Sequence, residues 1–456
     1  MVELRKGERG AVQGEISEGE PLCPNHESRL QRWSKLLTHF MVGQSSVQAL
    51  NLIVGFLLLR WMSVAAYAQY STAFAFQSTL NQLVDLGFSG CIVALVGTRR
   101  DEPGVVGTYV RNSRHLRLRM FLIIGLASGI AFPLVVARQP WPAELKFALW
   151  VSVILAVLVQ GQMLYGAPLL MQRSIRTVYA SQVAASGFRA LSLVIMHFGR
   201  VLTSSTASCV GSVALGLQGY LYKRYGSRLI VEPKRPDLAV IKEIRTYLAP
   251  LWPGMIYYAF QSQITIGLIS IFGKTQNIAE VAALGRLGQL FLLLSAMNGA
   301  IIEPYIAQVG RHMLAKRYIL IASACFVISF AITTCASIAP EPFLWLLGAK
   351  YVQLKPLIGW MMLSSSLGYF AGVLFMMNTA RKWVYWRTTL PSLTAVILVQ
   401  AGLLFELDLR RTSSMIGLSI GMSLSTSVAF ICVAIYGYYH TNSSESDLSL
   451  GESKCT

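Results

Sequence analysis

Residues 65–97 read AAYAQYSTAFAFQSTLNQLVDLGFSGCIVALVG and decide the fold of this chain. The stretch is long enough to cross a bilayer, yet Gln77, Asn81 and Asp85 lie four residues apart in its middle. On a helix of about 3.6 residues per turn these three side chains share one face, while the opposite face is Ala, Phe, Leu and Val. This pattern predicts a membrane span that faces lipid on one side and a polar interior on the other.

The composition of the whole chain is that of a membrane protein. Of its 456 residues, 54% are hydrophobic and 13% are charged, and the mean hydropathy is positive. Apolar runs of about 20 residues, the length needed to cross roughly 30 Å of hydrocarbon, recur from near residue 36 to near residue 439. We therefore predict an all-α polytopic membrane protein.

The apolar runs predict twelve transmembrane helices in two lobes of six. The first six spans are expected at about 37–59, 66–97, 118–137, 147–171, 178–199 and 204–222, and the second six at about 247–272, 279–308, 318–338, 355–379, 386–405 and 413–438. The domains are then a cytoplasmic tail at 1–35, an N-terminal lobe at 36–222, a cytoplasmic linker at 223–245, a C-terminal lobe at 246–439 and a polar tail at 440–456. We expect both tails to be disordered. Two lobes of six spans have the same orientation, so a pseudo-twofold axis along the membrane normal would relate them.

The formal net charge of +18 indicates orientation rather than a nucleic-acid partner, because most Lys and Arg lie in short loops. One side of the membrane collects Arg29, Arg32, Lys35, the arginines from Arg99 to Arg119, the linker, and the groups at 311–317 and 381–387. The other side has scattered charges, namely Arg138, Lys146, Lys274 and Lys350. The positive-inside rule therefore places both termini in the cytoplasm, which requires an even number of spans.

Two further spans carry polar side chains at helical spacing. The first has Gln44, Gln48 and Asn51, and the seventh has Tyr257 and Gln261. Amides at membrane depth often hydrogen-bond between helices as packing contacts. Because three helices show such a stripe, we favour a hydrated cavity between the lobes, lined by these residues together with Gln77, Asn81 and Asp85.

Charged side chains within spans are costly unless they face protein or water. Arg189 lies near the middle of the fifth span and is expected to face the interior, and Arg286 enters the eighth span from the outer side. Both are candidates for holding an anionic substrate in the cavity. The structural alternatives are an ion pair between Arg189 and Asp85, and an Arg286 that reaches the membrane interface.

The sequence offers no chemistry of a soluble enzyme. It has no phosphate-binding G-x-x-x-x-G-K-[ST] loop, no G-x-S-x-G elbow and no H-E-x-x-H pair, so we expect neither an enzyme nor a cofactor. The seven cysteines lie mostly inside spans and lack metal-ligand spacing. Cys23 and His26 lie close together in the N-terminal tail without further ligand residues beside them, and they are not expected to hold a metal.

Two short motifs resemble a known family. Residues 60–70, RWMSVAAYAQY, and residues 85–88, DLGF, are similar to the polysaccharide biosynthesis proteins, the O-antigen and exopolysaccharide flippases of the multidrug/oligosaccharidyl-lipid/polysaccharide exporter superfamily. In that family an arginine closes the first span, Gly-x-Tyr opens the second and Asp-Leu-Gly follows within it. Residues 248–309 resemble the start of the second half. The chain departs from the family at Ala68, where the glycine of Gly-x-Tyr is expected, and at residues 282–284 in the second half.

The resemblance implies the exporter-superfamily fold and a flippase of the bacterial inner membrane. Such a protein moves a polyprenyl-diphosphate-linked oligosaccharide from the cytoplasmic to the periplasmic leaflet by alternating access, for assembly of O-antigen, capsule or exopolysaccharide. Its partners would be the lipid-linked oligosaccharide, membrane lipids, and a polysaccharide polymerase with glycosyltransferases.

Three alternatives remain open on the sequence. A cation-coupled multidrug antiporter of the same superfamily is expected to carry an acidic residue in the first span, and this chain has none there. A peptidoglycan-precursor flippase typically has two further spans. A membrane-embedded glycosyltransferase or polymerase needs a large outer loop or paired loop carboxylates, and the outer loops here are short.

Overall fold

The structure is a computed structural model that describes residues 29–452 except 173, 250, 273, 382, 384–385 and 409–410. The chain divides into two compact units, Met1–Thr38 and His39–Thr456. Within the first unit, the described residues 29–38 are the beginning of helix α1, and Cys23 and His26 lie outside the described part. The second unit contains helices and, among its described residues, no strand, which confirms the all-α class.

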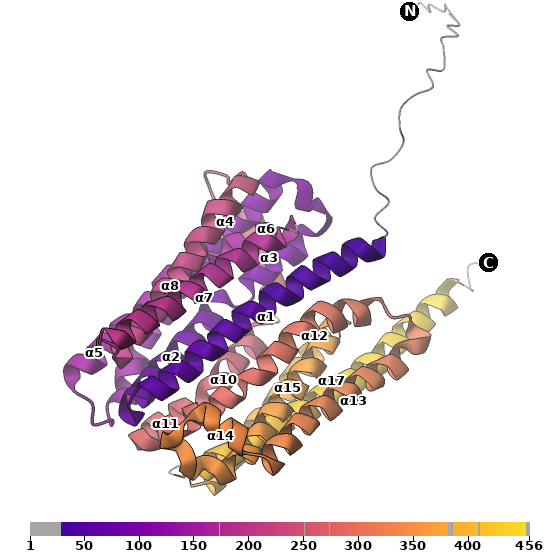
Figure 1. The fold of residues 1–456 in the computed structure, drawn as a ribbon. Coiled ribbons are helices and arrows are strands. Elements are labelled where there is room, and N and C mark those ends of the chain that lie inside the picture. Colours follow the sequence, from indigo (N-terminus) through magenta and orange to yellow (C-terminus); the bar gives the residue numbers. More distant parts are fainter. Residues whose placement is uncertain are drawn as a thin grey trace, which may run out of the picture. The chain divides into compact units, whose positions relative to one another are not determined.

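The N-terminal half of the second unit forms six spans from the helices α1 to α8 (Figure 1). Two of the six are interrupted: the second consists of α2 and α3, and the fourth of α5, the 3-10 helix η2 and α6. The bounds are α1 (Arg29–Trp61), α2 (Val64–Asp85), α3 (Phe88–Val96), α4 (Pro103–Val136), α5 (Ala143–Val159), η2 (Gln160–Tyr165), α6 (Gly166–Met171), α7 (Ile175–Phe198) and α8 (Ser204–Gly226).

The break between α2 and α3 falls at the end of the polar stripe. Leu86 has φ 36° and Gly87 has φ 82°, both in the left-handed region. This conformation is unfavourable for leucine, so tertiary packing must hold it. Leu86 is 2% exposed and packs with Leu83 and Ala259. The break therefore ends α2 at Asp85 and redirects the chain at that residue.

The C-terminal half repeats the arrangement from α10 to α17 (Figure 1). Its second span is again interrupted, between α11 and α12 at Gly288. The bounds are α10 (Trp252–Phe272), α11 (Thr275–Leu287), α12 (Gln289–Gln308), α13 (Arg311–Ile338), α14 (Glu341–Leu347), η4 (Ala349–Leu357), α15 (Ile358–Ala380), α16 (Trp386–Glu406) and α17 (Thr412–Glu452). Helix α17 thus continues past residue 440, where the sequence places the start of a tail.

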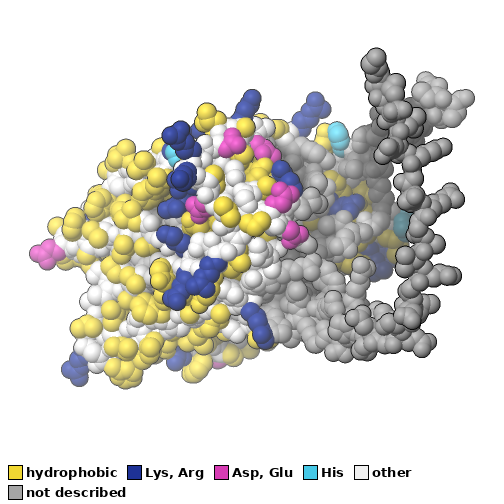
Figure 2. Space-filling model, turned by 90° about the horizontal axis from the view of Figure 1, so that it is seen from above, with side chains coloured by type: hydrophobic (Ala, Val, Ile, Leu, Met, Phe, Trp, Pro, Cys, Tyr) yellow, Lys and Arg dark blue, Asp and Glu magenta, His cyan; other side chains and the backbone are white. Residues whose placement is uncertain are grey.

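Eight of the described helices are both long and apolar enough to cross a membrane: they are in α1, α4, α5 to α6, α7, α13, η4 to α15, α16 and α17. Helices α2 and α8 fall outside this set because they are rich in Ser, Thr, Gln and Gly. Large apolar side chains such as Leu126, 71% exposed on α4, cover the outside of the spans, as lipid contact requires. Figure 2 shows such hydrophobic surface beside a band of Lys and Arg side chains.

The linker between the lobes is structured. It contains the 3-10 helix η3 (Ser227–Leu229) and the amphipathic helix α9 (Leu238–Leu248), whose Ile241, Ile244 and Leu248 pack on the first lobe. The backbone of Val231 runs so close to α4 that a Cβ on Gly107 would lie 2.0 Å from its carbonyl oxygen. Glycine is therefore required at residue 107, and the linker is fixed to the ends of the first-lobe helices.

Candidate functional site

A large cavity lies between the two lobes. Its volume is about 1290 Å³, above the ~300–1,000 Å³ of most small-molecule sites. Residues of α1 to α4, η2, α7 and α8 line it from the first lobe, and residues of α10 to α12 and α15 to α17 line it from the second. It extends from Arg286 to the ends of α10 and α16 that adjoin the basic loops. The cavity has room for a substrate larger than a drug-sized molecule.

Most residues that the sequence assigned to a cavity do line this one. The lining residues among them are Gln48, Asn51, Gln77, Asn81, Asp85, Arg189, Gln261 and Arg286. Gln44 and Tyr257 do not line it. The hydroxyl of Tyr257 donates instead to Gln400 Oε1 at 2.9 Å, a contact between α10 and α16. For Tyr257 the structure therefore shows packing between helices.

The amides of the polar stripes divide between packing and cavity. Gln77 is 5% exposed, and its Nε2 donates to the Ser152 carbonyl at 3.1 Å and to the hydroxyls of Ser208 and Ser212 at 3.2 Å each. These bonds tie α2 to α5 and α8, so Gln77 acts mainly between helices. Asn81 differs, because its Oδ1 has no hydrogen-bond partner among the described residues. A buried acceptor of this kind is costly unless water or a ligand satisfies it.

Arg189 approaches the cavity from α7. Its Nη2 donates to the hydroxyl of Tyr70 at 2.6 Å, and its guanidinium carbon lies 6.0 Å from the centre of the Phe74 ring. Gly211 on α8 lies beside the side chain, since a Cβ there would be in ordinary van der Waals contact with Arg189 Nε at 3.8 Å. That Nε is buried and, within the described structure, has no hydrogen-bond acceptor. The guanidinium thus keeps a donor for an anion.

Arg286 approaches the same aromatic face of α2 from the second lobe. It is 7% exposed, and its Nε donates to the Tyr67 hydroxyl at 3.1 Å. Its guanidinium lies 4.9 Å from the Phe74 ring centre and 6.0 Å from that of Tyr70. Contact with ring faces stabilises a buried cation. Arg286 is therefore buried between the lobes, which rules out the alternative that it reaches the interface.

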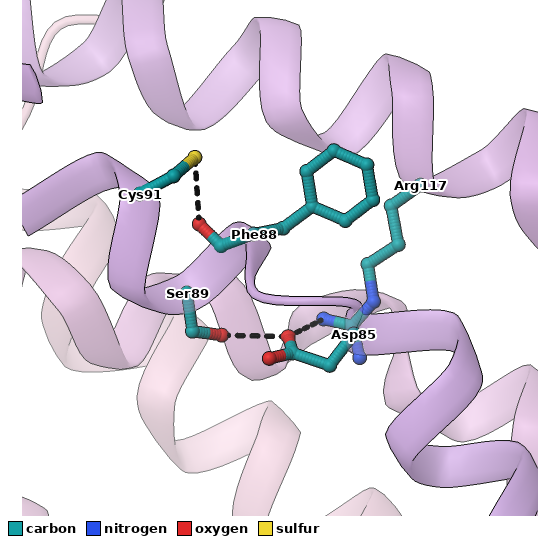
Figure 3. A network of polar contacts seen from close by, with 5 residues as sticks. All are labelled: Asp85, Phe88, Ser89, Cys91 and Arg117. Atoms are coloured by element: carbon teal, nitrogen blue, oxygen red, sulfur yellow. Dashed lines mark hydrogen bonds and ion pairs between the residues drawn. The ribbon is translucent and has the colours of Figure 1, made fainter. Parts of the chain in front are cut away.

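Asp85 does not form the ion pair with Arg189 that the sequence offered as an alternative; it lies beside Arg117 instead. Its Oδ1 lies 3.8 Å from Nη1 of Arg117 on α4 and accepts a 2.7 Å hydrogen bond from Ser89 Oγ (Figure 3). Arg117 is 3% exposed and Asp85 is 33% exposed. The physical reason is the break after Asp85, which ends α2 beside α4. The pair joins α2, α3 and α4 at the cavity wall.

Sequence reasoning missed Arg117, Tyr67, Tyr70 and Phe74. Arg117 belongs to the basic run that sets the orientation, so its charge was assigned to a loop. The aromatic residues, in contrast, are spaced three and four apart, the spacing of one helix face. That spacing is readable in the sequence and marks the surface on which both arginines converge.

The end of the cavity away from the basic loops is closed by polar contacts between the lobes. Gln139 Nε2 donates to the Ser270 carbonyl at 2.8 Å, and Thr275 Oγ1 donates to Gln139 Oε1 at 2.9 Å. Lys350 donates to the carbonyl oxygens of Arg60 and Met62 at 2.9 and 2.7 Å. We call these contacts the outer seal. These contacts close one end of the cavity, and the cavity extends to the helix ends at the other. The structure therefore represents a state that is closed on one side.

We expect cysteines at Gln48 and Asn81 to react with a small water-soluble thiol reagent, because both residues line the cavity. The measurement uses a chain whose seven native cysteines are replaced. A cysteine at Leu126 is the control and should stay unreactive in hydrocarbon, whereas Leu58 is fully buried and would not test lipid exposure. Equal silence at Gln48, Asn81 and Leu126 would assign the two polar residues to packing.

Comparison with known proteins identifies the fold. No family model and no curated protein matches the chain. Two matching solved structures are an inward-facing and an outward-facing conformation of a multidrug resistance MATE family transporter of the MOP superfamily. The inward-facing one has TM-score 0.62 at 13% identity and covers 89% of this chain and 99% of its own; the outward-facing one has TM-score 0.62 at 16% identity, with 91% and 96% covered.

A third match is a MOP superfamily transporter from Pyrococcus furiosus, with TM-score 0.61, 14% identity, and 90% of this chain and 95% of that one covered. At these identities the likeness concerns the fold alone. The chain has the MOP superfamily fold of twelve transmembrane helices in two six-helix lobes, as predicted, and is a multi-pass membrane protein.

Proposed function

We propose that the protein is a flippase for a polyprenyl-diphosphate-linked oligosaccharide. The observation that carries this proposal is the charge of the cavity. Among the described lining residues the charged side chains are Arg117, Arg189, Arg286 and Asp85, and the single carboxylate is already paired with Arg117. Arginine binds phosphate with a planar pair of donors and stays protonated at membrane depth. The cavity therefore favours an anionic headgroup.

The same observation disfavours the runner-up, a cation-coupled multidrug antiporter. A cationic drug is stabilised by free carboxylates, and the described cavity wall supplies only Asp85, which Arg117 and Ser89 already engage. The solved transporter from Pyrococcus furiosus is itself described as having a binding pocket of reverse polarity that suggests a different function. Reverse pocket polarity on this fold is thus a precedent for a different function.

The two walls of the cavity differ in the number of charged side chains. Arg117, Arg189 and Asp85 belong to the first lobe. Apart from Arg286, the described second-lobe wall has no charged side chain; hydroxyls and amides such as Gln261, Asn378 and Thr426 line it beside aliphatic and aromatic groups, and hydroxyls and amides such as Gln48, Asn81 and Ser186 line the first-lobe wall as well. Hydroxyls and amides bond sugar hydroxyls. The diphosphate would lie against the arginines, and the hydroxyls and amides of both walls would bind the oligosaccharide.

The proposed direction follows from the basic loops. The cavity reaches the helix ends beside those loops, which the positive-inside rule places in the cytoplasm. The outer seal would then face the periplasm of a bacterial inner membrane. Loading from the cytoplasmic leaflet and opening of the seal would complete one cycle of alternating access. A polymerase and glycosyltransferases would use and supply the glycan.

Deletion of the gene that encodes this protein should cause a lipid-linked oligosaccharide to accumulate on the cytoplasmic face of the membrane. Extraction of lipids and protection of the glycan from an externally added glycosidase in spheroplasts measure this. Re-expression of the parent chain is the control and should restore exposure of the glycan. Unchanged glycan exposure together with greater sensitivity to cationic drugs would support the antiporter instead.

A further inference from the structure

Arg286 is anchored across the boundary between the lobes. It belongs to α11 of the second lobe, yet it lies against α1 and α2 of the first. A Cβ on Gly55 of α1 would lie 3.3 Å from both Cδ and Nη1 of Arg286. This is tighter than ordinary van der Waals contact, so glycine at residue 55 provides the space that the guanidinium occupies.

The partners of Arg286 are the hydroxyls of Tyr67 and Tyr70 and aromatic rings. Its Nε donates to Tyr67, and the hydroxyl of Tyr67 lies 3.5 Å from the carbonyl of Ala282, one turn earlier on α11. Tyr67 is fully buried. The described part of the chain gives Arg286 no carboxylate within ion-pair distance. A buried cation with such partners is stabilised less than one that meets an anion.

Arg286 also lies between two regions of the protein, the cavity and the outer seal. It lines the cavity, and its contact with Tyr67 lies on the side of the outer seal, where Thr72 of α2 approaches Ser270 of α10 at 3.5 Å. Arg189 makes no comparable bridge, because both it and its partner Tyr70 belong to the first lobe. A group that binds Arg189 need not move the lobes, whereas a group that binds Arg286 competes with a contact between them.

We propose that Arg286 converts the binding of an anion into opening of the outer seal. In the empty cavity Arg286 fastens the second lobe to Tyr67. A phosphate in the cavity draws the guanidinium away from Tyr67, because a charge-assisted bond to an anion is stronger than a bond to a neutral hydroxyl. Loss of the Tyr67 contact then weakens the seal. The identity of the anion as a diphosphate rests on the proposed function, while the fastening contact itself does not.

A buried cysteine in the seal reports the opening. The test uses purified protein in detergent, in the chain without native cysteines, with Ser270→Cys as the reporter, because Ser270 is fully buried between the lobes. The rate of alkylation by a small water-soluble maleimide is measured with and without inorganic diphosphate, at matched ionic strength. Binding of diphosphate is measured separately by calorimetry.

Without diphosphate, Tyr67→Phe should raise the alkylation rate about fivefold, the effect expected from the loss of one hydrogen bond. Arg286→Lys should raise the rate similarly, because the shorter side chain keeps the charge but loses the fork. Diphosphate should raise the alkylation rate of the parent and should leave the alkylation rate of Arg286→Gln unchanged. The matched variant Arg189→Gln should keep the full rise but require more diphosphate.

An unchanged rate in both Tyr67→Phe and Arg286→Lys would overturn the fastening role. A full diphosphate response in Arg286→Gln would overturn its role as the sensor. If the parent binds diphosphate and the rate of alkylation stays constant, the inference fails and the proposed function stands. If calorimetry finds no binding to the parent, the anion step fails together with the proposed function, while the basal rates still decide the fastening contact.

Discussion

Arg189→Ala should lower transport of the lipid-linked oligosaccharide by about 30-fold or more while the amount of folded protein stays near that of the parent. The guanidinium holds Tyr70 at 2.6 Å and keeps a buried Nε without an acceptor in the described structure. A hydrogen bond to a charged group contributes about 2 kcal/mol, and about 1.36 kcal/mol corresponds to a tenfold change in rate. Glycan exposure in spheroplasts and immunoblotting of membranes measure the two quantities.

Two further variants give the prediction its controls. Arg189→Lys should restore transport in part, since it keeps the charge and loses the planar pair of donors. Arg119→Ala removes an arginine that is exposed on α4 and outside the cavity, so transport should be unchanged. Full transport by Arg189→Ala would remove Arg189 from the mechanism.

The structure also predicts how Arg189→Ala affects Asp85. Because Asp85 lies beside Arg117, loss of Arg189 leaves the carboxylate with its partner. Adding Asp85→Asn to Arg189→Ala should therefore not restore transport. Restoration by the double variant would indicate that Arg189 and Asp85 interact in another state of the cycle.

The number and positions of the spans were predictable, because a helix that crosses hydrocarbon needs a fixed length of apolar sequence. The breaks inside three of the spans, between α2 and α3, at η2, and between α11 and α12, were not. The left-handed Leu86 depends on packing against Ala259, a residue far away in the chain. The break at Gly288 likewise lies where a Cβ would meet Ser365 Oγ at 2.6 Å. Contacts of this kind have no signature in the local sequence.

The cavity was predictable as a region and less so residue by residue. Helical spacing puts Gln77 and Asn81 on one face, and both residues line the cavity. The hydrogen bonds of each amide depend on the neighbouring helices: Gln77 donates to serine groups, whereas Asn81 has an acceptor without a partner in the described structure. In the same way, the charge of Arg117 was visible in the sequence, but its burial at 3% depends on how α4 packs.

The pair formed by Asp85 and Arg117 leads to the second large effect, which concerns stability. Asp85→Asn should lower the free energy of unfolding by about 2 kcal/mol. Breaking a fully buried pair from one side costs about 3–5 kcal/mol, and the lower value allows for the 33% exposure of Asp85 and the 3.8 Å separation. The reduction should appear as a lower apparent Tm of the purified protein in detergent.

Removal of the other partner should have a smaller effect. Arg117→Met keeps an unbranched side chain of similar length without charge, and it leaves Asp85 with Ser89 and partial access to the cavity. The expected loss is below about 1 kcal/mol, since an exposed ion keeps its hydration. The double variant Asp85→Asn with Arg117→Met should resemble Arg117→Met alone, because the buried charge is gone. An Asp85→Asn protein as stable as its parent would show that the pair contributes nothing to folding, whereas equal losses in the two single variants would show that burial does not set the difference between them.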